Sequence, residues 1–201
     1  MSIYGEHRER LEAFSQRLMK LIEDYREEKK KETGMDPVEH CLCRIKSDES
    51  MREKCRRKGY IEDHHSALER IHDAVGIRVV CPFISDVYAI RDHLLSTEGI
   101  ISRDEKDYIR HAKPNGYRSL HLILYCEDNS LGLEGYYAEV QLRTISMDTW
   151  AALEHHLKYK KDVQGNTELI VKELKRCADE LASTDVSMQT IRDMILGESL
   201  S

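Results

Sequence analysis

The chain of 201 residues carries a formal net charge of −6 and is 40% hydrophobic and 34% charged. These values suit one soluble globular domain with a buried core and exclude an intrinsically disordered chain; the bulk charge gives no sign of nucleic-acid binding. No apolar run is long enough to cross a bilayer, and the first residues lack the apolar segment of a signal peptide, so we expect a cytoplasmic protein without a membrane partner.

An amphipathic helix is predicted over residues 6–31. Apolar residues recur there at steps of three and four, opposite a heavily charged face. They are Leu11, Phe14, Leu18, Leu21, Ile22 and Tyr25. Thr33-Gly34 is expected to end this helix, and Asp36-Pro37 to open a short helical turn.

A short strand and a basic helix follow. The alternation over residues 41–45 predicts a strand that shows Arg44 and Lys46 on one face. Residues 50–53, Ser-Met-Arg-Glu, match a capping box, in which a hydroxyl and a carboxylate bond free backbone amides. We therefore expect a helix over residues 50–58, with the following glycine as its stop.

The middle of the chain reads as alternating helices and strands. Residues 62–72 fit a helical pattern, and residues 75–81 fit a buried strand whose other face carries Gly76 and Arg78. Ser85 is the expected N-cap of the next helix.

Further strands come in the second half. A short strand is expected at residues 100–102, and a loop at 113–117 leads into a strand at 120–126. Another strand over residues 136–143 alternates apolar and polar side chains. Ser146 is expected to cap the helix after it.

A long C-terminal helix is predicted over residues 167–196. Its apolar residues recur in nearly heptad steps, which fits both packing onto the domain and a subunit interface. They are Ile170, Leu174, Cys177, Leu181, Met188, Ile191 and Ile195. The whole pattern predicts a fold of helices and strands (α/β in the broad sense, α+β by class), in which helices flank a mixed sheet. An N-terminal helix (1–35) and a C-terminal helix (165–201), a candidate oligomerisation element, extend the central domain (36–164).

The cysteines and most histidines predict no metal site. The six cysteines include no C-x-x-C pair, and Cys41, Cys43, Cys81 and Cys126 fall in strand-like patterns. We expect these to be buried free thiols in a reducing compartment. A Cys41-x-Cys43 site lacks spaced partner ligands, the adjacent histidine pairs lack zinc spacing, and no P-loop occurs.

Two carboxylates are candidates for catalysis. Asp73 lies just before the strand at 75–81, and Glu139 lies on the polar face of the strand at 136–143. Taken alone, each has an ordinary interpretation, Asp73 as a turn cap and Glu139 as a solvent-facing residue. Carboxylates brought together by neighbouring strands are, however, what Mg²⁺ on a nucleotide polyphosphate requires.

Cations and one aromatic residue surround these carboxylates in the predicted sheet. Arg44 and Arg78 lie on the polar sides of their strands, where a guanidinium can stack on a base or bond phosphate. The next helix adds candidates for neutralising a triphosphate, Lys54, Arg57 and Lys58. Tyr117, after the turn at Gly116, is a candidate platform for a second base, or else an aromatic residue packed on the sheet.

Several segments resemble, in order, the synthetase domain of the RelA/SpoT family. They are Arg44-Ile45-Lys46, Ser50 to Lys58, Asp73 to Arg78, Asp107-Tyr108-Ile109, Lys113 to His121, and Glu139 to Thr144 followed by Trp150 and Glu154-His155. The Asn-Gly-Tyr-x-Ser-Leu-His and Glu-x-Gln-x-Arg-Thr pair is highly specific. The length resembles the family's stand-alone small alarmone synthetases of the RelQ and RelP kind.

The resemblance implies a nucleotidyltransferase-like fold and a pyrophosphokinase of the stringent response. The β,γ-pyrophosphate of ATP passes to the 3′-hydroxyl of GDP or GTP, giving ppGpp or pppGpp and AMP. By motif position, Asp73 and Glu139 hold Mg²⁺, and Glu139 also activates the hydroxyl. The residues implied for ATP are Arg44 and Arg78 at the adenine and Lys46, Lys54, Arg57 and Lys58 at the phosphates. Those implied for the acceptor are Tyr117, stacked on guanine, with Lys113, His121 and Gln141.

The resemblance also bears on regulation and assembly. The chain starts and ends too close to the motifs for the family's hydrolase and regulatory domains, so synthesis without degradation is expected. Residues 104–107, Asp-Glu-Lys-Asp, match neither common form of a charge signature linked to GDP or GTP preference, which leaves that preference open. The terminal helices resemble those that assemble small synthetases into homotetramers.

Two alternatives stay open beside alarmone synthesis. Some small family members are toxins that pyrophosphorylate the tRNA 3′ end or adenosine nucleotides, although the acidic net charge disfavours a stable nucleic-acid partner. A catalytically silent nucleotide-sensing module is the other. Loss of Asp73 or Glu139 would favour it, and both are present.

Overall fold

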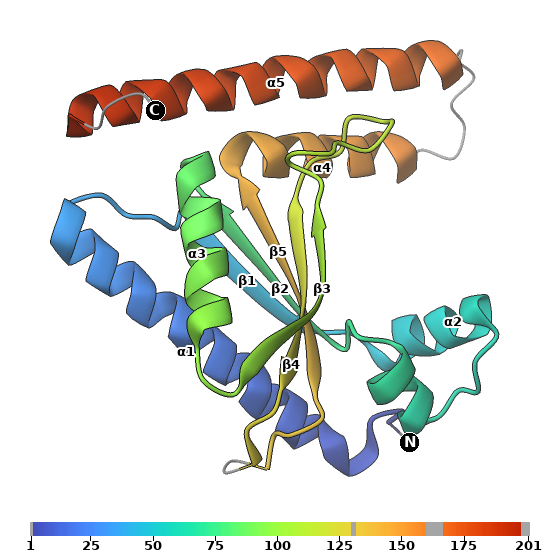
Figure 1. Cartoon of the computed structure of the whole chain (residues 1–201). Coiled ribbons are helices and arrows are strands. Elements are labelled where there is room, and N and C mark those ends of the chain that lie inside the picture. Colours follow the sequence, from blue (N-terminus) through green and yellow to red (C-terminus); the bar gives the residue numbers. More distant parts are fainter. Residues whose placement is uncertain (1, 130–131, 160–166, 198–201) are drawn as a thin grey trace.

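The computed structural model describes residues 2–129, 132–159 and 167–197, and its centre is one five-stranded mixed sheet (Figure 1). The strands are β1 (His40–Ile45), β2 (Val75–Cys81), β3 (Ile100–Asp107), β4 (Leu120–Cys126) and β5 (Tyr137–Thr144). They lie in the order β1-β2-β5-β4-β3. Only β2 and β5 run parallel, and the other neighbours are antiparallel. The predicted mixed sheet is confirmed, and β3 is longer than the expected strand at residues 100–102.

Helices cover one face and one end of this sheet. They are α1 (Arg8–Thr33), α2 (Asp48–Lys58), α3 (Ile84–Ser96), α4 (Ile145–Tyr159) and α5 (Thr167–Leu196), with short helical segments at Gly5–His7 and Ser66–Arg70. Figure 1 shows α1 and α3 against the sheet and α5 running along α4. Among the described residues, no helix has the length and apolar character needed to span a bilayer.

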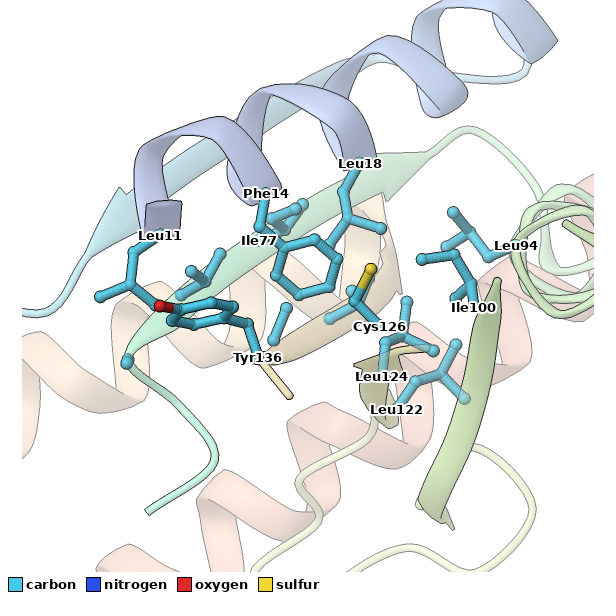
Figure 2. Close-up of a cluster of buried hydrophobic side chains, with 14 of the residues drawn as sticks. Leu11, Phe14, Leu18, Ile77, Leu94, Ile100, Leu122, Leu124, Cys126 and Tyr136 are labelled. Carbon is cyan, nitrogen blue, oxygen red and sulfur yellow. The ribbon is translucent and has the colours of Figure 1, made fainter. Parts of the chain in front are cut away.

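The core lies between the sheet and the α1–α3 side. Leu11, Phe14 and Leu18 of α1 point toward Ile77 of β2 and Leu124 of β4 (Figure 2), and all of them are buried. Fully burying such a side chain contributes about 1.5–3 kcal/mol. Because side chains alternate along a strand, the same strands show their polar residues on the opposite face. That second face carries the candidate site.

The glycines that end the first two helices are as predicted, but the N-terminal caps are not. Gly34 and Gly59 end α1 and α2 with φ of 73° and 72°, as expected. The cap of α2, however, is Ser47, whose hydroxyl accepts a hydrogen bond from the Ser50 amide. The capping box at Ser50 is therefore wrong, since Ser50 lies inside the helix. α3 begins one residue before Ser85 and has no side-chain cap.

The start of α4 departs in the same way. Ser146 lies inside α4, and the Thr144 hydroxyl accepts the hydrogen bond from the Met147 amide at 3.2 Å.

Two other predicted helical segments differ in the structure. Only Ser66–Arg70 of the predicted helix at 62–72 forms a regular segment, a π-helical one. No helical turn opens at Asp36, because its carboxylate instead pairs with Arg26 of α1 at 2.8 Å.

The C-terminal helix forms as predicted, but much of its apolar stripe stays exposed. Met188, Ile191 and Ile195 are exposed, while Ala178 and Asp185 are the buried side chains.

The cysteines are all free thiols. Cys81 and Cys126 are buried as expected, and Cys41 is half-buried. The expectation that Cys43 is buried is wrong. Cys43 lies on the edge strand β1, where neighbours cover only one side.

Candidate active site

The polar face of the sheet carries two rows of residues that cross all five strands. The first row is Arg44, Gly76, Glu139, Ile123 and Asp104, and the second is Leu42, Arg78, Gln141, His121 and Lys106. Neighbours two residues apart on one strand are about 7 Å apart, so both rows fit beneath one nucleotide-sized ligand. The register therefore brings five of the predicted site residues onto one surface: Arg44, Arg78, His121, Glu139 and Gln141.

Asp73 holds two lysines at the edge of this surface. Its Oδ2 lies 2.7 Å from Lys46 Nζ and 2.5 Å from Lys54 Nζ, and all three side chains are mostly buried. Lys46 directly follows β1, and Lys54 projects from α2. A cluster of two cations and one anion has excess positive charge, which suits a polyphosphate. The structure thus brings Lys46 and Lys54, two of the four residues that the sequence assigned to ATP phosphates, together with Asp73, one of the two assigned to the metal.

Arg57 and Lys58 lie one turn further along α2, on the same face as Lys54. Both are exposed, and in the described part of the chain neither side chain forms an ion pair. Their predicted contact with phosphates stays a prediction.

Glu139 is an ionised carboxylate in a polar setting. Its Oε1 lies 3.7 Å from His121 Nδ1, and its Oε2 accepts a hydrogen bond from Gln141 Nε2 at 2.9 Å. The neighbouring His121, followed by Gln141 and Lys54, lowers the pKa of Glu139 to about 2, although burial opposes this. Glu139 therefore keeps its charge throughout the neutral pH range. Lys54 pairs with Asp73 and also interacts electrostatically with Glu139, which couples the two carboxylates through one cation.

These two carboxylates suit a hard divalent cation with few protein ligands. Asp73 Oδ1 is buried and has no hydrogen-bond partner among the described residues, so this oxygen is available to coordinate a cation. No cluster of three or more His, Cys, Asp or Glu side chains suited to a metal occurs in the described part of the chain. Mg²⁺ typically binds one or two carboxylates and completes its shell with phosphate and water. Asp73 and Glu139 fit that pattern.

Arg44 and Arg78 lie between two cavities. One cavity of about 200 Å³ extends from Arg44 and Arg78 to Glu139 and Gln141. The other, of about 500 Å³, extends from the same arginines to Tyr117. The Arg44 side chain lies over Gly76, which has no side chain to block it. Burial lowers the pKa of Arg78, and its Nε is buried without a partner among the described residues.

Tyr117 is fixed by its hydroxyl as well as by its ring. The hydroxyl lies 2.8 Å from His121 Nε2 and accepts a hydrogen bond from Arg143 Nη2 at 2.7 Å. Lys113 Nζ lies 4.7 Å from the centre of the ring, and Trp150 contacts the ring edge-on. Tyr117 is consequently half-buried and tightly positioned rather than freely exposed on its loop.

Arg143 and Asp148 are functional candidates that the sequence analysis missed. Arg143 is nearly fully buried and donates to Tyr117, to Gln141 Oε1 at 3.0 Å and to Asp148 Oδ1 at 2.9 Å. The same Asp148 oxygen lies 3.4 Å from Arg78 Nη1. This pair therefore links Arg78 on one side of the site with Tyr117 on the other.

A family model described as a region found in RelA / SpoT proteins matches residues 43–164. The GTP pyrophosphokinase YwaC of Bacillus subtilis is 42% identical over 160 residues, which cover 79% of this chain and 76% of that protein. The GTP pyrophosphokinase YjbM of the same organism is 35% identical over 163 residues, with coverages of 80% and 75%. Longer relatives match over a smaller part of their length, such as a GTP pyrophosphokinase of Escherichia coli, 25% identical over 18% of that protein.

Solved structures agree over nearly the whole chain. The crystal structure of small alarmone synthetase 1 from Bacillus subtilis, bound to its product pppGpp, superposes with a TM-score of 0.76 at 29% identity, and 94% of each chain is covered. Small alarmone synthetase 2 from Bacillus subtilis gives a TM-score of 0.72 at 36% identity, covering 92% of this chain and 93% of that chain.

Proposed function

This chain belongs to the RelA/SpoT family, and we propose that it is a (p)ppGpp synthetase that transfers the β,γ-pyrophosphate of ATP to the 3′-hydroxyl of GDP or GTP. The observation that carries this proposal is the pair of rows on the polar face. They join a cationic, carboxylate-containing cluster at Asp73 to an aromatic platform at Tyr117. A GTP pyrophosphokinase needs both, one for the donor and one for the acceptor.

The donor side neutralises and positions ATP. Arg44 and Arg78 line both cavities, and a guanidinium group offers a flat surface on which the adenine base can stack. Lys46 and Lys54 would leave Asp73 for the phosphates, and Asp73 and Glu139 would then hold Mg²⁺. That ion supplies charge neutralisation on the phosphates and acidifies a bound hydroxyl.

The acceptor side brings the 3′-hydroxyl to the β-phosphorus. The Tyr117 ring offers a face for guanine, while His121 and Gln141 lie in the same row as Arg78, directly beside Glu139. Glu139 can accept a hydrogen bond from the attacking hydroxyl and orient its lone pair. With its pKa near 2, Glu139 is a weak general base, so its main contribution is charge and orientation.

The acceptor is tested by competition. The purified protein is incubated with Mg²⁺, γ-labelled ATP and equal concentrations of GDP, GTP, ADP and bulk tRNA, and the products are separated. We expect label on the guanosine nucleotides with release of AMP. Label on tRNA or on adenosine nucleotides alone would place the protein with the toxin-type enzymes, and no transfer would favour a nucleotide sensor.

We propose in addition that the protein is cytoplasmic and assembles, as a tetramer, through α5. The supporting observation is a set of exposed apolar side chains along this helix, Val186, Met188, Ile191, Met194 and Ile195. Exposed apolar patches of this kind are typical of subunit interfaces. Light scattering measures the mass of the assembly directly.

Tyr117→Phe separates the two roles of this residue. The variant keeps the ring but loses the hydroxyl contacts to His121 and Arg143. We expect the KM of the guanosine acceptor to rise about threefold to tenfold, since the net contribution of a hydrogen bond is about 0.5–1.5 kcal/mol. Tyr117→Ala removes the stacking surface too and should cost more. Equal KM values in wild type and both variants would exclude Tyr117 from the acceptor site.

Asp148→Asn tests the link between the two sides. The change removes the charge that holds both Arg78 and Arg143. We therefore expect the KM values of ATP and of the acceptor to rise together, each by about fivefold, because a buried ion pair is left with one partner. Steady-state kinetics in both substrates measures this. A rise in only one KM would show that Asp148 serves one side alone.

A further inference from the structure

The C-terminal helix α5 lies outside residues 43–164, the region that defines the family, yet it contacts the loop that carries Tyr117. Gly116 of that loop is buried against α5, with φ of +92°. A Cβ placed on Gly116 would lie 2.6 Å from Ala178 Cβ and 3.2 Å from Lys175 Cα, so the backbone of the loop rests directly on the helix.

Arg118 stabilises this contact between the loop and α5 through hydrogen bonds to both. Its Nη1 donates to Gly116 O at 3.2 Å and to Ala178 O at 3.3 Å, while Nη2 pairs with Asp179 Oδ1 at 2.9 Å. One guanidinium thus bonds the loop carbonyl, the helix backbone and a helix carboxylate. The Arg118 side chain is only 18% exposed, which limits competition from water.

Other contacts anchor α5 close to the site. The Thr144 hydroxyl, at the end of β5, donates to buried Asp185 at 2.6 Å. Trp150 of α4 contacts the Tyr117 ring and donates through Nε1 to Leu174 O at 2.8 Å. Hence the position of α5 is fixed by the same strand and helix that frame the acceptor side.

We propose that α5 is a positioning element for the acceptor side, acting through the contact of Ala178 with Gly116 and through the Arg118–Asp179 pair. The helix holds the Gly116 turn so that Tyr117 faces the acceptor nucleotide. This inference rests on the proposed function for its substrate but not for its geometry. It gives residues 167–196 a role within one protomer, apart from any role in assembly.

Two variants of α5 test it. Asp179→Ala removes the partner of Arg118, and Ala178→Leu pushes a larger side chain against Gly116; alanine and leucine both favour the helical state, so α5 is retained. The matched control is Glu180→Ala, because Glu180 pairs with Arg176 on the same helix and not with the loop. We expect the acceptor KM to rise about threefold in Asp179→Ala and about tenfold in Ala178→Leu, with the KM of ATP unchanged.

Hydrogen exchange supplies a readout that does not depend on activity. We expect the amides of residue 113 and residues 115–118 to exchange faster in both variants than in the control, and those of β4 to exchange at an unchanged rate. Unchanged exchange in this loop, equal rises in both KM values, or a KM change that follows a change in assembly mass would overturn the proposal. If wild-type protein transfers nothing, the proposed function fails, and exchange still decides whether α5 holds the loop.

Discussion

Glu139→Gln is expected to lower the rate of pyrophosphate transfer by about 10³-fold or more, because one change removes both the proposed metal ligand and the group proposed to orient the nucleophile. The carboxamide has the same shape as the carboxylate, and Gln141 can still hydrogen-bond to its oxygen. Only the charge is lost. With the pKa of Glu139 near 2, the wild-type residue is ionised at every pH at which the enzyme is assayed, so the variant differs from it throughout.

ATP binding distinguishes loss of chemistry from loss of the site. Calorimetry on Glu139→Gln is expected to give an ATP affinity within about threefold of the wild type, since Arg44, Arg78, Lys46 and Lys54 remain. Glu127→Gln is the control, because Glu127 is exposed and outside both rows. Turnover within tenfold of the wild type would contradict the role given to Glu139.

Asp73→Asn is expected to strengthen ATP binding in the absence of metal but to lower turnover in the presence of Mg²⁺. In the structure Asp73 neutralises Lys46 and Lys54 at 2.7 Å and 2.5 Å. Without this anion, both lysines are available to ATP and no carboxylate repels the phosphates. We expect ATP to bind several-fold more tightly in the presence of a chelator, because attraction between opposite charges at such a distance exceeds about 1 kcal/mol even in water.

Turnover of Asp73→Asn in the presence of Mg²⁺ is expected to fall by about 10²-fold or more, since an amide oxygen binds this ion less strongly than a carboxylate does. Binding is measured by calorimetry with and without Mg²⁺, and transfer by product separation. Asp92→Asn serves as the control, because Asp92 is exposed and, in the described part of the chain, its carboxylate pairs with its neighbour Arg91 alone. Weaker metal-free binding, or full turnover, would show that Asp73 does not balance the lysines.

The sheet and the core could be predicted because alternation fixes which residues face inward. Leu120, Leu122 and Leu124 alternate with polar or half-buried residues, and a one-residue slip in register would turn all three to the other face of the sheet. Helix ends were predicted less well. Ser47 and Ser50 both suit a cap, and only the extended backbone at Ser47, with ψ of 150°, decides between them.

The two sides of the site differ in how much the sequence revealed. Asp73, Glu139 and the lysines belong to recognisable motifs. The pairing of β2 with β1 on one side and β5 on the other explains how Asp73, just before β2, comes close to Lys46, just after β1, and to the strand that carries Glu139. Arg143 is the arginine of the Glu-x-Gln-x-Arg-Thr motif, but the motif alone assigned it no role. Its role comes from contacts with Tyr117 and Asp148, which the chain brings together through the start of α4. A further signal in the sequence is the acidic residue in the first turn of α4, five residues after this arginine.

The position of phosphorus from ATP in the product tests the central claim most directly. Wild-type protein is incubated with GDP, Mg²⁺ and ATP labelled at the β-phosphorus, and the products are separated and counted. We predict that the β-label appears in the guanosine product in a one-to-one ratio with AMP released, because the β,γ-pyrophosphate moves as a unit. Recovery of the β-label in ADP would mean transfer of a single phosphoryl group and would contradict the account.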